Sequence, residues 1–444
     1  MSRLALGIRF FGSHGGGDRR DVGSRHAFLS EGSWFLRGER MVSSTARSMR
    51  SLAPEETLLY ARQWSATAGI SEVRDITDLD VLDVPVFVSV RPRAHGESFT
   101  FGKGLRQVDA EVGAYMEALE FFFAEPGVGS VSTHWGSARN VAGQDRVDAI
   151  LDFVPLLQRE VDLDSPLLLA AVEDIESGDE CAIPAELIYY PAPDCGQSLF
   201  GSSTNGLASG NSLLEASIQA LLELIERDIW SFECVRSASR LVVTASLPDE
   251  VREIVDRAER NGLQLKVRTI PNDYGIPFFA VFVFDLNNPS RQTFNGGWAC
   301  DLDRGRALVR AVTEAAQSRV AFIHGGRKAP RFRAEGSSSD AQEQEARLVR
   351  QHMLGVIDSR QEMLLTDIPD LAVDETMQQQ FDAVIQRLRR VVREPIYRAV
   401  FTSPESPLQV VRLVVPLLEN LKETRVRLGP RLKAAIESFG AQAA

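Results

Sequence analysis

The sequence has few residues of the kinds that cross-link a chain covalently or through a metal ion. Its 444 residues include four cysteines, which are widely spaced and form no C-x-x-C pair: Cys181, Cys195, Cys234 and Cys300. The six histidines do not cluster at the spacing of metal ligands. We therefore expect no structural zinc site, and free thiols as is usual in a reducing cytoplasm.

The sequence also lacks the features of membrane proteins and of nucleic-acid-binding proteins. No apolar run approaches the roughly 20 residues that cross a bilayer, and the N-terminal stretch MSRLALGIRFFGSHGGG has no good signal-peptide cleavage region. The formal net charge of −12 argues against nucleic-acid binding, because a basic surface is needed to neutralise phosphates. These absences predict a cytoplasmic protein that binds neither a membrane nor nucleic acid.

Three familiar catalytic motifs are incomplete. GESFTFGKG (96–104) resembles a P-loop, but five residues separate its glycines and Gly104 stands where Ser or Thr must bind Mg²⁺. HGGG (14–17) resembles an esterase oxyanion loop, yet the sequence has no G-x-S-x-G nucleophile elbow. His134 has no paired base or nucleophile in the sequence, and a lone histidine is more often structural.

The remaining sequence is that of a globular chain long enough for two or three hydrophobic cores. Apolar spacing and end signals predict helices over 53–70, 109–125, the part of 206–228 that follows a flexible glycine loop, 304–323 and 429–440. Alternating or β-branched runs predict strands over 84–92, 184–191, 263–270, 277–286, 396–402 and 408–416. Helices and strands mix throughout, so the predicted fold class is α/β or α+β.

An internal repeat involves two pairs of glutamates. GLASGNSLLEASIQALLELIERD (206–228) carries Glu223 and Glu226, and Glu223 lies thirteen positions after Gly210. GKGLRQVDAEVGAYMEALEF (102–121) has the same thirteen positions between Gly104 and Glu117. Glu120 then matches Glu226, and a looser third copy has Glu314 and Gln317 at the same offset. Matched spacing of this kind indicates duplicated units that face each other.

Residues three positions apart lie on one helix face, so each pair presents two carboxylates together. A solvated Glu-x-x-Glu pair is common on any helix, but here the flanks are apolar and the pattern recurs. If the units pack around a pseudo-twofold axis, four carboxylates converge and repel one another unless a cation binds. Oxygen ligands of this type suit Mg²⁺, which binds a few carboxylates together with the phosphates of a nucleotide.

Several segments resemble the YcaO superfamily. They are the two repeats above, RSLAPEETL (50–58), GISEVRDITDLDVLDVPVFVSVRP (69–92) and AVTEAAQSR (311–319). The resemblance implies a domain over about 48–433 with internally repeated helix and sheet units around an ATP cleft, and a mobile loop at 327–346. Residues 1–47 are then a variable N-terminal segment, too short for a fused leader-binding domain, and 434–444 form a short tail.

The resemblance implies binding of Mg-ATP without a Walker loop. By position, the Mg²⁺ ligands are Glu117, Glu120, Glu223 and Glu226. The ATP contacts implied in the same way are Arg50, Thr57, Ser209, Asn211, Gln219 and Gln317. Arg319 joins the four glutamates as a catalytic residue. Two positions depart from the family pattern, since Phe121 stands where Arg is usual and Gly113 replaces a common Ser.

The activity implied by the resemblance is ATP-dependent activation of peptide backbone amides in a ribosomally made peptide or protein. The product is a thioamide, an azoline or an amidine, depending on the nucleophile. A leader-bearing substrate peptide, a separate leader-binding partner that is ubiquitin-activating-enzyme-like or TfuA-like, and a homodimer or hetero-complex are expected. The sequence ends in ESFGAQAA without the Pro-x-Pro-x-Pro tail of azoline-forming members, which favours non-azoline chemistry. The alternatives are an azoline-forming cyclodehydratase subunit and a non-catalytic accessory protein.

Overall fold

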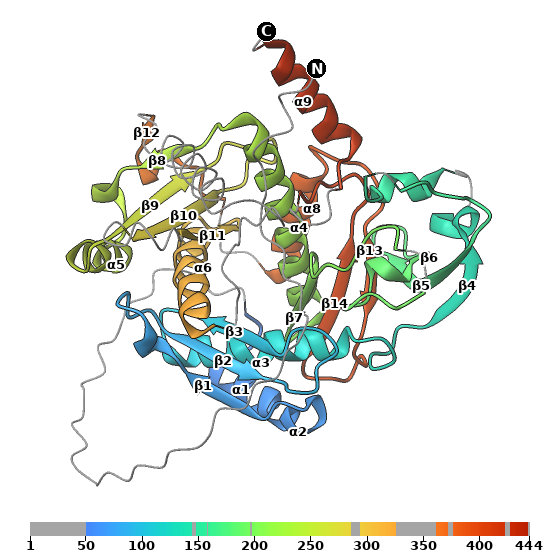
Figure 1. The fold of residues 1–444 in the computed structure, drawn as a ribbon, viewed down its shortest axis with the longest axis horizontal. Helices are drawn as coiled ribbons and strands as arrows, with labels where there is room; N and C mark the ends of the chain where they lie inside the picture. The colour runs from blue at the N-terminus through green and yellow to red at the C-terminus, as the bar shows by residue number, and fades with distance from the viewer. Residues whose placement is uncertain are drawn as a thin grey trace, which may run out of the picture.

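The computed structural model describes residues 50–143, 148–157, 159–195, 198–285, 294–325, 361–371, 376–421 and 427–442. The N-terminal segment 1–47 and the predicted mobile loop 327–346 lie outside the described residues. The described chain forms three β-sheets with helices between and around them (Figure 1). The predicted mixed class is confirmed as α+β, because the sheets are mainly antiparallel.

Each sheet has a defined strand order. The three-stranded sheet has the order β1-β2-β3: β1 Glu72–Asp75, β2 Val86–Val90 and β3 Phe99–Lys103. The five-stranded sheet has the order β11-β10-β9-β8-β12: β11 Phe294–Cys300, β10 Phe278–Asp285, β9 Leu263–Thr269, β8 Arg240–Val242 and β12 Glu362–Met363. The six-stranded sheet has the order β4-β5-β13-β14-β7, and β6 pairs with β5: β4 Thr133–Ser137, β5 Pro166–Asp174, β13 Tyr397–Val400, β14 Gln409–Val414, β7 Leu207–Gly210 and β6 Glu180–Pro184.

The helices fall into two groups by position. Three long helices lie between the sheets: α3 Gln107–Phe123, α4 Leu213–Arg236 and α6 Arg304–His324. The others lie outside them: α1 Pro54–Gln63, α2 Ser65–Ala68, α5 Asp249–Arg260, α8 Met377–Leu388 and α9 Pro430–Gln442. The helices predicted over 53–70, 109–125, 304–323 and 429–440 are confirmed, the first of them as α1 and α2. The expected domain boundary after residue 433 falls inside α9.

Two of the local predictions are wrong. The predicted strand 184–191 forms a short 3-10 helix over Ala185–Leu187 instead, because Glu186 accepts backbone N–H groups of the loop at 199–201 and fixes a turn. The predicted flexible loop before α4 is strand β7, all of whose residues are buried. Small residues have little intrinsic β preference, so pairing with β14, between Ser209 and Val410 for example, decides this strand.

The repeat consists of three units, each a strand followed directly by a long helix. The units are β3–α3, β7–α4 and β11–α6. In each unit the first member of the repeated pair lies ten positions after the helix begins: Glu117 after Gln107, Glu223 after Leu213 and Glu314 after Arg304. The looser third copy therefore has the same strand–helix structure as the other two copies.

The three units close into a ring. Helix α3 contacts β7 of the second unit, α4 contacts β11 of the third, and α6 contacts β3 of the first. Figure 1 shows α4 between the five-stranded and six-stranded sheets, and its core includes residues from both, such as Phe282 and Val411. The expected pseudo-twofold pairing is thus wrong, because the third unit completes the contact that two units would leave open.

Close packing of strand against helix depends on glycine. A Cβ at Gly102 on β3 would collide with the backbone of Ala110 and Ala114 on α3, and one at Gly297 on β11 would collide with the backbone of α6. Gly113 contributes from the helix side, because a Cβ there would lie 3.1 Å from the Cα of Gly102. The glycine at 113 therefore has a local packing function.

We predict that Gly102→Ala lowers the free energy of unfolding by about 3 kcal/mol, because the new Cβ overpacks two backbones that cannot move apart cheaply. Gly305→Ala in the first turn of α6 is the matched control, since its Cβ meets one atom, Asp303 Oδ1 at 3.1 Å. We expect that control to stay within about 1 kcal/mol of the wild type. Chemical denaturation measures both, and equal effects would contradict the packing argument.

Candidate functional site

The residues at which the three long helices begin determine the direction in which their paired residues point. The side chain of Ser212 caps α4 by accepting the N–H of Glu215, and that of Asp303 caps α6 by accepting the N–H of Arg306. Such caps satisfy backbone donors that a helix leaves unpaired at its first turn. Because all three helices begin at equivalent positions, their third and fourth turns present the same face to the neighbouring unit.

The second member of each pair faces the strand of the next unit. Glu120 on α3 accepts a hydrogen bond of 2.6 Å from the hydroxyl of Ser209 on β7. Gln317 on α6 donates to the carbonyl of Phe101 on β3. Burial raises the pKa of the Cys300 thiol on β11, and the charge of Glu226 on α4 adds to the shift. The three contacts join the units into one site.

Burial and like charge raise the pKa of two glutamates well above the ordinary range. Burial raises the pKa of Glu120 to about 8, with Glu117 and Glu223 adding to the shift. Burial also raises the pKa of Glu226 to about 8, and Glu314 and Glu223 contribute. Carboxylates from α3, α4 and α6 are therefore within electrostatic reach of one another.

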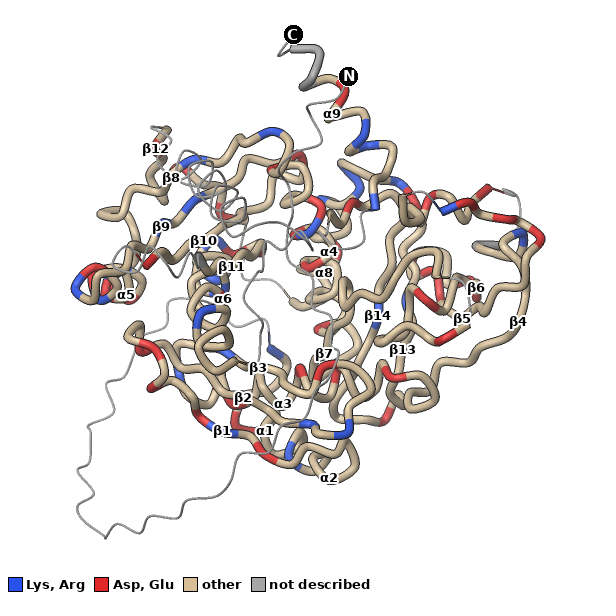
Figure 2. Tube along the Cα trace, in the orientation of Figure 1, with Lys and Arg blue, Asp and Glu red and all other residues tan. Residues whose placement is uncertain are grey.

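Cationic side chains partly offset these acids. Arg227 lies 3.8 Å from Glu223 and 3.2 Å from Glu226, measured between guanidinium nitrogen and carboxylate oxygen. Lys103 on β3 forms an ion pair of 2.8 Å with Glu314 on α6. Figure 2 shows basic and acidic positions interspersed along the described chain.

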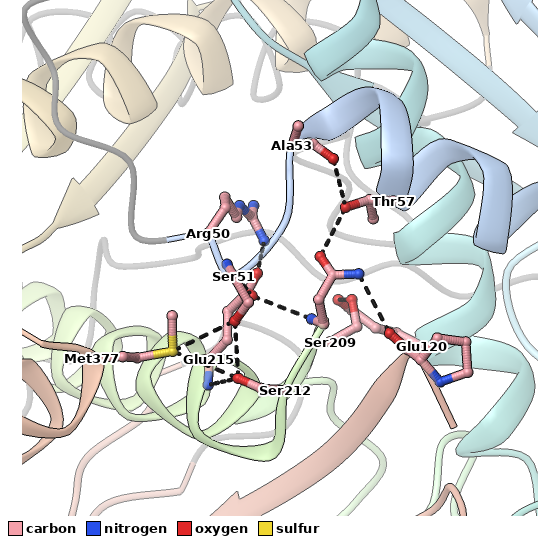
Figure 3. Close-up of polar contacts among 11 residues, drawn as sticks. Arg50, Ser51, Ala53, Thr57, Glu120, Ser209, Ser212, Glu215 and Met377 are labelled. Carbon is pink, nitrogen blue, oxygen red and sulfur yellow. Dashed lines mark hydrogen bonds and ion pairs between the residues drawn. The ribbon is translucent and has the colours of Figure 1, made fainter. Parts of the chain in front are cut away.

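A second cluster of polar contacts lies at the start of α4 (Figure 3). The carboxylate of Glu215, which is 1% exposed, accepts from Arg50 Nη1 at 3.0 Å, from Ser51 N at 2.9 Å and from Asn211 N at 3.3 Å. The hydroxyl groups of Ser51 and Ser212 are 3.1 Å apart. Glu215 thus fastens the chain that enters α1 to the turn between β7 and α4.

The two clusters meet through α1. Thr57 Oγ1 donates to Asn211 Oδ1 at 2.8 Å, and Asn211 lies two positions after Ser209, which donates to Glu120. Four of the six residues predicted to contact ATP, Arg50, Thr57, Ser209 and Asn211, therefore lie along one continuous path (Figure 3).

The other predicted residues occupy different surroundings. Gln219 is partly buried on α4, one turn before Glu223. Arg319 donates to Asp80 Oδ1 at 2.8 Å, and this pair fastens α6 to the 3-10 turn Thr77–Leu79. Phe121 packs against Tyr190 with ring centroids 5.1 Å apart, which gives the side chain at this position a packing partner.

The donor set fits Mg²⁺ held jointly with nucleotide phosphates. Hard cations take oxygen ligands, and Mg²⁺ retains several positions for water or phosphate. In the described part of the chain, no three or more Asp, Glu, His or Cys side chains are arranged to hold a metal ion by themselves. The carboxylates at 117, 120, 223 and 226 could therefore supply a few ligands, with phosphate oxygens completing the sphere. Bound cations would also relieve the like-charge repulsion that adds to the effect of burial on the two pKa values.

Sequence reasoning missed Glu215, Lys103 and the cationic partners on α6. The spacing Ser212-x-x-Glu215 is that of a capping box, so this glutamate reads as a helix cap. Lys103 belongs to the GKG stretch. It meets Glu314 only because helix α6 of the third unit packs against strand β3 of the first. Arg310, 3.6 Å from the buried Asp301, has no sequence signal of its own.

We predict that Mg²⁺ binding releases protons. Since the pKa of Glu120 and that of Glu226 are raised to about 8, the metal must displace protons at neutral pH, and the apparent Mg²⁺ affinity should rise with pH up to that value. Without metal, the same shifts stabilise the fold at low pH, and that contribution is lost as pH rises through about 8. Calorimetry in buffers of different ionisation enthalpy measures the protons, and Glu120→Gln should release fewer. Proton uptake would contradict the assignment.

Comparisons with known proteins agree with this arrangement. The family model described as YcaO cyclodehydratase, ATP- and Mg²⁺-binding, matches residues 101–419. A Methanothermobacter thermautotrophicus protein described as uncharacterized is 30% identical over 397 residues, covering 87% of this chain and 99% of that protein. A Rhizobium leguminosarum protein described as uncharacterized, in the tfuA 3′ region, is 31% identical over 395 residues, covering 86% and 91%.

A solved structure shares the fold. YcaO from Methanopyrus kandleri, bound with AMPPCP and Mg²⁺, superposes with a TM-score of 0.67 at 22% identity, covering 86% of this chain and 96% of that one. The expected cofactors, ATP and Mg²⁺, are those of the matching family, and the predicted family is confirmed. Among the described helices, none has the length and apolar character for crossing a bilayer. The chain belongs to the YcaO family of ATP- and Mg²⁺-binding cyclodehydratases.

Proposed function

We propose that this protein activates backbone amides of a ribosomally made peptide by ATP-dependent phosphorylation of the amide oxygen. A nucleophile adds to the carbonyl carbon, the oxyanion accepts the γ-phosphoryl group, and the oxygen leaves as inorganic phosphate. Mg-ATP supplies the phosphoryl group, because water or hydroxide would be a poor leaving group. Sulfide as the nucleophile gives a thioamide, a Cys, Ser or Thr side chain gives an azoline, and an amine gives an amidine.

The observation that carries this proposal is the ring of acidic helix positions. Glu117 and Glu223 act electrostatically on Glu120, Glu223 also acts on Glu226, and burial raises the pKa of Glu120 and of Glu226 to about 8. A cluster that costs stability without a cation is suited to binding one. Burial raises the pKa of the Cys300 thiol, so this cysteine is not an activated nucleophile. Phosphoryl transfer needs positioning and charge neutralisation rather than covalent catalysis by the protein.

Different residues of this chain then bind the metal, contact the nucleotide and position those contacts. The four glutamates hold the metal ions that neutralise the phosphates, and Arg50, Thr57 and Asn211 contact the nucleotide from the start of α1 and α4. Glu215 positions Arg50 and Asn211 by accepting from both. Arg319, fixed by Asp80, orients α6 against the first unit.

We propose a TfuA-like protein as the partner that presents the peptide. The support is the Rhizobium relative, which is described as a protein in the tfuA 3′ region and whose match covers 86% of this chain. Ring closure to an azoline is the second candidate, because the family description names cyclodehydratases. A non-catalytic accessory protein is the third class, and Mg²⁺-dependent ATP binding distinguishes it. Gly113 and Phe121 give it little support, since each has a packing function here.

We predict that a heavy-oxygen label on the peptide amide carbonyl appears in the inorganic phosphate. The reaction contains the protein, its partner, peptide, ATP and Mg²⁺, with and without sulfide, and mass spectrometry reads phosphate and peptide. Exchange of one oxygen for sulfur identifies the thioamide, and loss of one water without sulfide identifies the azoline. Inorganic phosphate that contains no label from the amide oxygen would exclude amide phosphorylation.

We also predict that Glu117→Ala and Glu223→Ala each abolish ATP turnover and that the double variant is no worse. Residues that act as one unit have non-additive effects on rate. Glu223→Gln should lose turnover while its thermal midpoint stays near that of the metal-free wild type, because removing one of several like charges relieves repulsion. Multiplying losses in the double variant would mean that the two helices serve separate sites.

A further inference from the structure

The residue four positions before each of the three helices interacts with a glutamate on another unit. These residues are Lys103 before α3, Ser209 before α4 and Cys300 before α6. Ser209 donates to Glu120 on α3, and Cys300 lies near Glu226 on α4. Lys103 completes the series by pairing with Glu314 on α6. The ring thus places a hydroxyl, a thiol and an ammonium group at equivalent positions around one centre.

The ion pair between Lys103 and Glu314 is built to be exchangeable. A single nitrogen–oxygen distance of 2.8 Å joins them, and the two side chains are 26% and 24% exposed. Ion pairs with this much solvent access contribute little to stability. The lysine stem is flexible and carries a compact point charge. Of the three lysines in the described residues, Lys266 on β9 and Lys433 on α9 lie outside the ring, and Lys103 lies on it.

Glu314 still has two positively charged neighbours when the Lys103 side chain moves away. Both Arg227 on α4 and Arg310 on α6 interact electrostatically with it. Arg310 also lies 3.6 Å from Asp301, so it is held near the end of β11. Loss of the lysine therefore does not strand an uncompensated buried charge, which would otherwise oppose the exchange.

We propose that Lys103 is a phosphate-binding residue of the nucleotide site and that Glu314 holds its ammonium group when no nucleotide is bound. The inference rests on the proposed function, because it requires Mg-ATP to occupy the ring. Nucleotide phosphates carry more negative charge than one carboxylate, so the ammonium moves from Glu314 to a phosphate oxygen on binding. Glu314 then competes with the nucleotide for Lys103.

The competition predicts effects of opposite sign for two neighbouring variants. We measure the dissociation constant of a nonhydrolysable ATP analogue with Mg²⁺ by calorimetry, on the full chain. Lys103→Met should weaken binding by at least tenfold, and Lys103→Arg should recover part of the loss. Glu314→Gln should tighten binding several-fold, because the competing carboxylate is gone. Lys266→Met and Glu253→Gln, on β9 and the exposed face of α5, make the same charge changes outside the ring and should leave binding unchanged.

Two results would overturn the inference. If Lys103→Met and Glu314→Gln shift binding in the same direction, or neither shifts it, the pair is a structural contact. Thermal unfolding of each variant shows whether weaker nucleotide binding is caused by loss of the fold. If Lys103→Met is unfolded, Lys103→Arg tests the inference in its place, since it preserves the charge. If the wild type itself shows no saturable binding, the proposed function fails and the inference fails with it.

Discussion

Repulsion between carboxylates held at the centre of the ring is the constraint on which the rest of the site depends. Three helices begin at equivalent positions and pack between the sheets, so their paired residues cannot move apart. The residues ten positions after the start are Glu117, Glu223 and Glu314, and those thirteen positions after it are Glu120, Glu226 and Gln317. Burial raises the pKa of Glu120 and of Glu226, and the neighbouring carboxylates add to the shift. A cation removes the repulsion, which links metal binding to both the proton balance and the stability of the fold.

The glycine contacts provide the stiffness that this constraint requires. Strand and helix approach so closely at Gly102 and Gly297 that no side chain fits between them. Each helix then packs on its own sheet and on that of the next unit. Displacing one pair of acids would therefore disturb two sheets, because protein cores resist continuous deformation.

The contacts around Glu215 show how the same ring accommodates the entering chain. A buried carboxylate normally needs several donors, and this one takes them from Arg50, Ser51 and Asn211. Those donors belong to the segments that carry the proposed nucleotide contacts, so one buried charge orders both. Asp80 does the corresponding work for Arg319 at the other side of α6.

The sequence by itself determined the mixed fold class, most of the long helices and strands, the Glu-x-x-Glu spacing and the family. These follow from local periodicity and from identical offsets, which need no knowledge of distant contacts. Only the tertiary structure decided that β7 is a strand, that the units number three, and that Lys103 meets Glu314 across more than two hundred positions of sequence. Those features arise from pairing and packing between segments far apart in the chain, and local residue preferences do not encode such contacts.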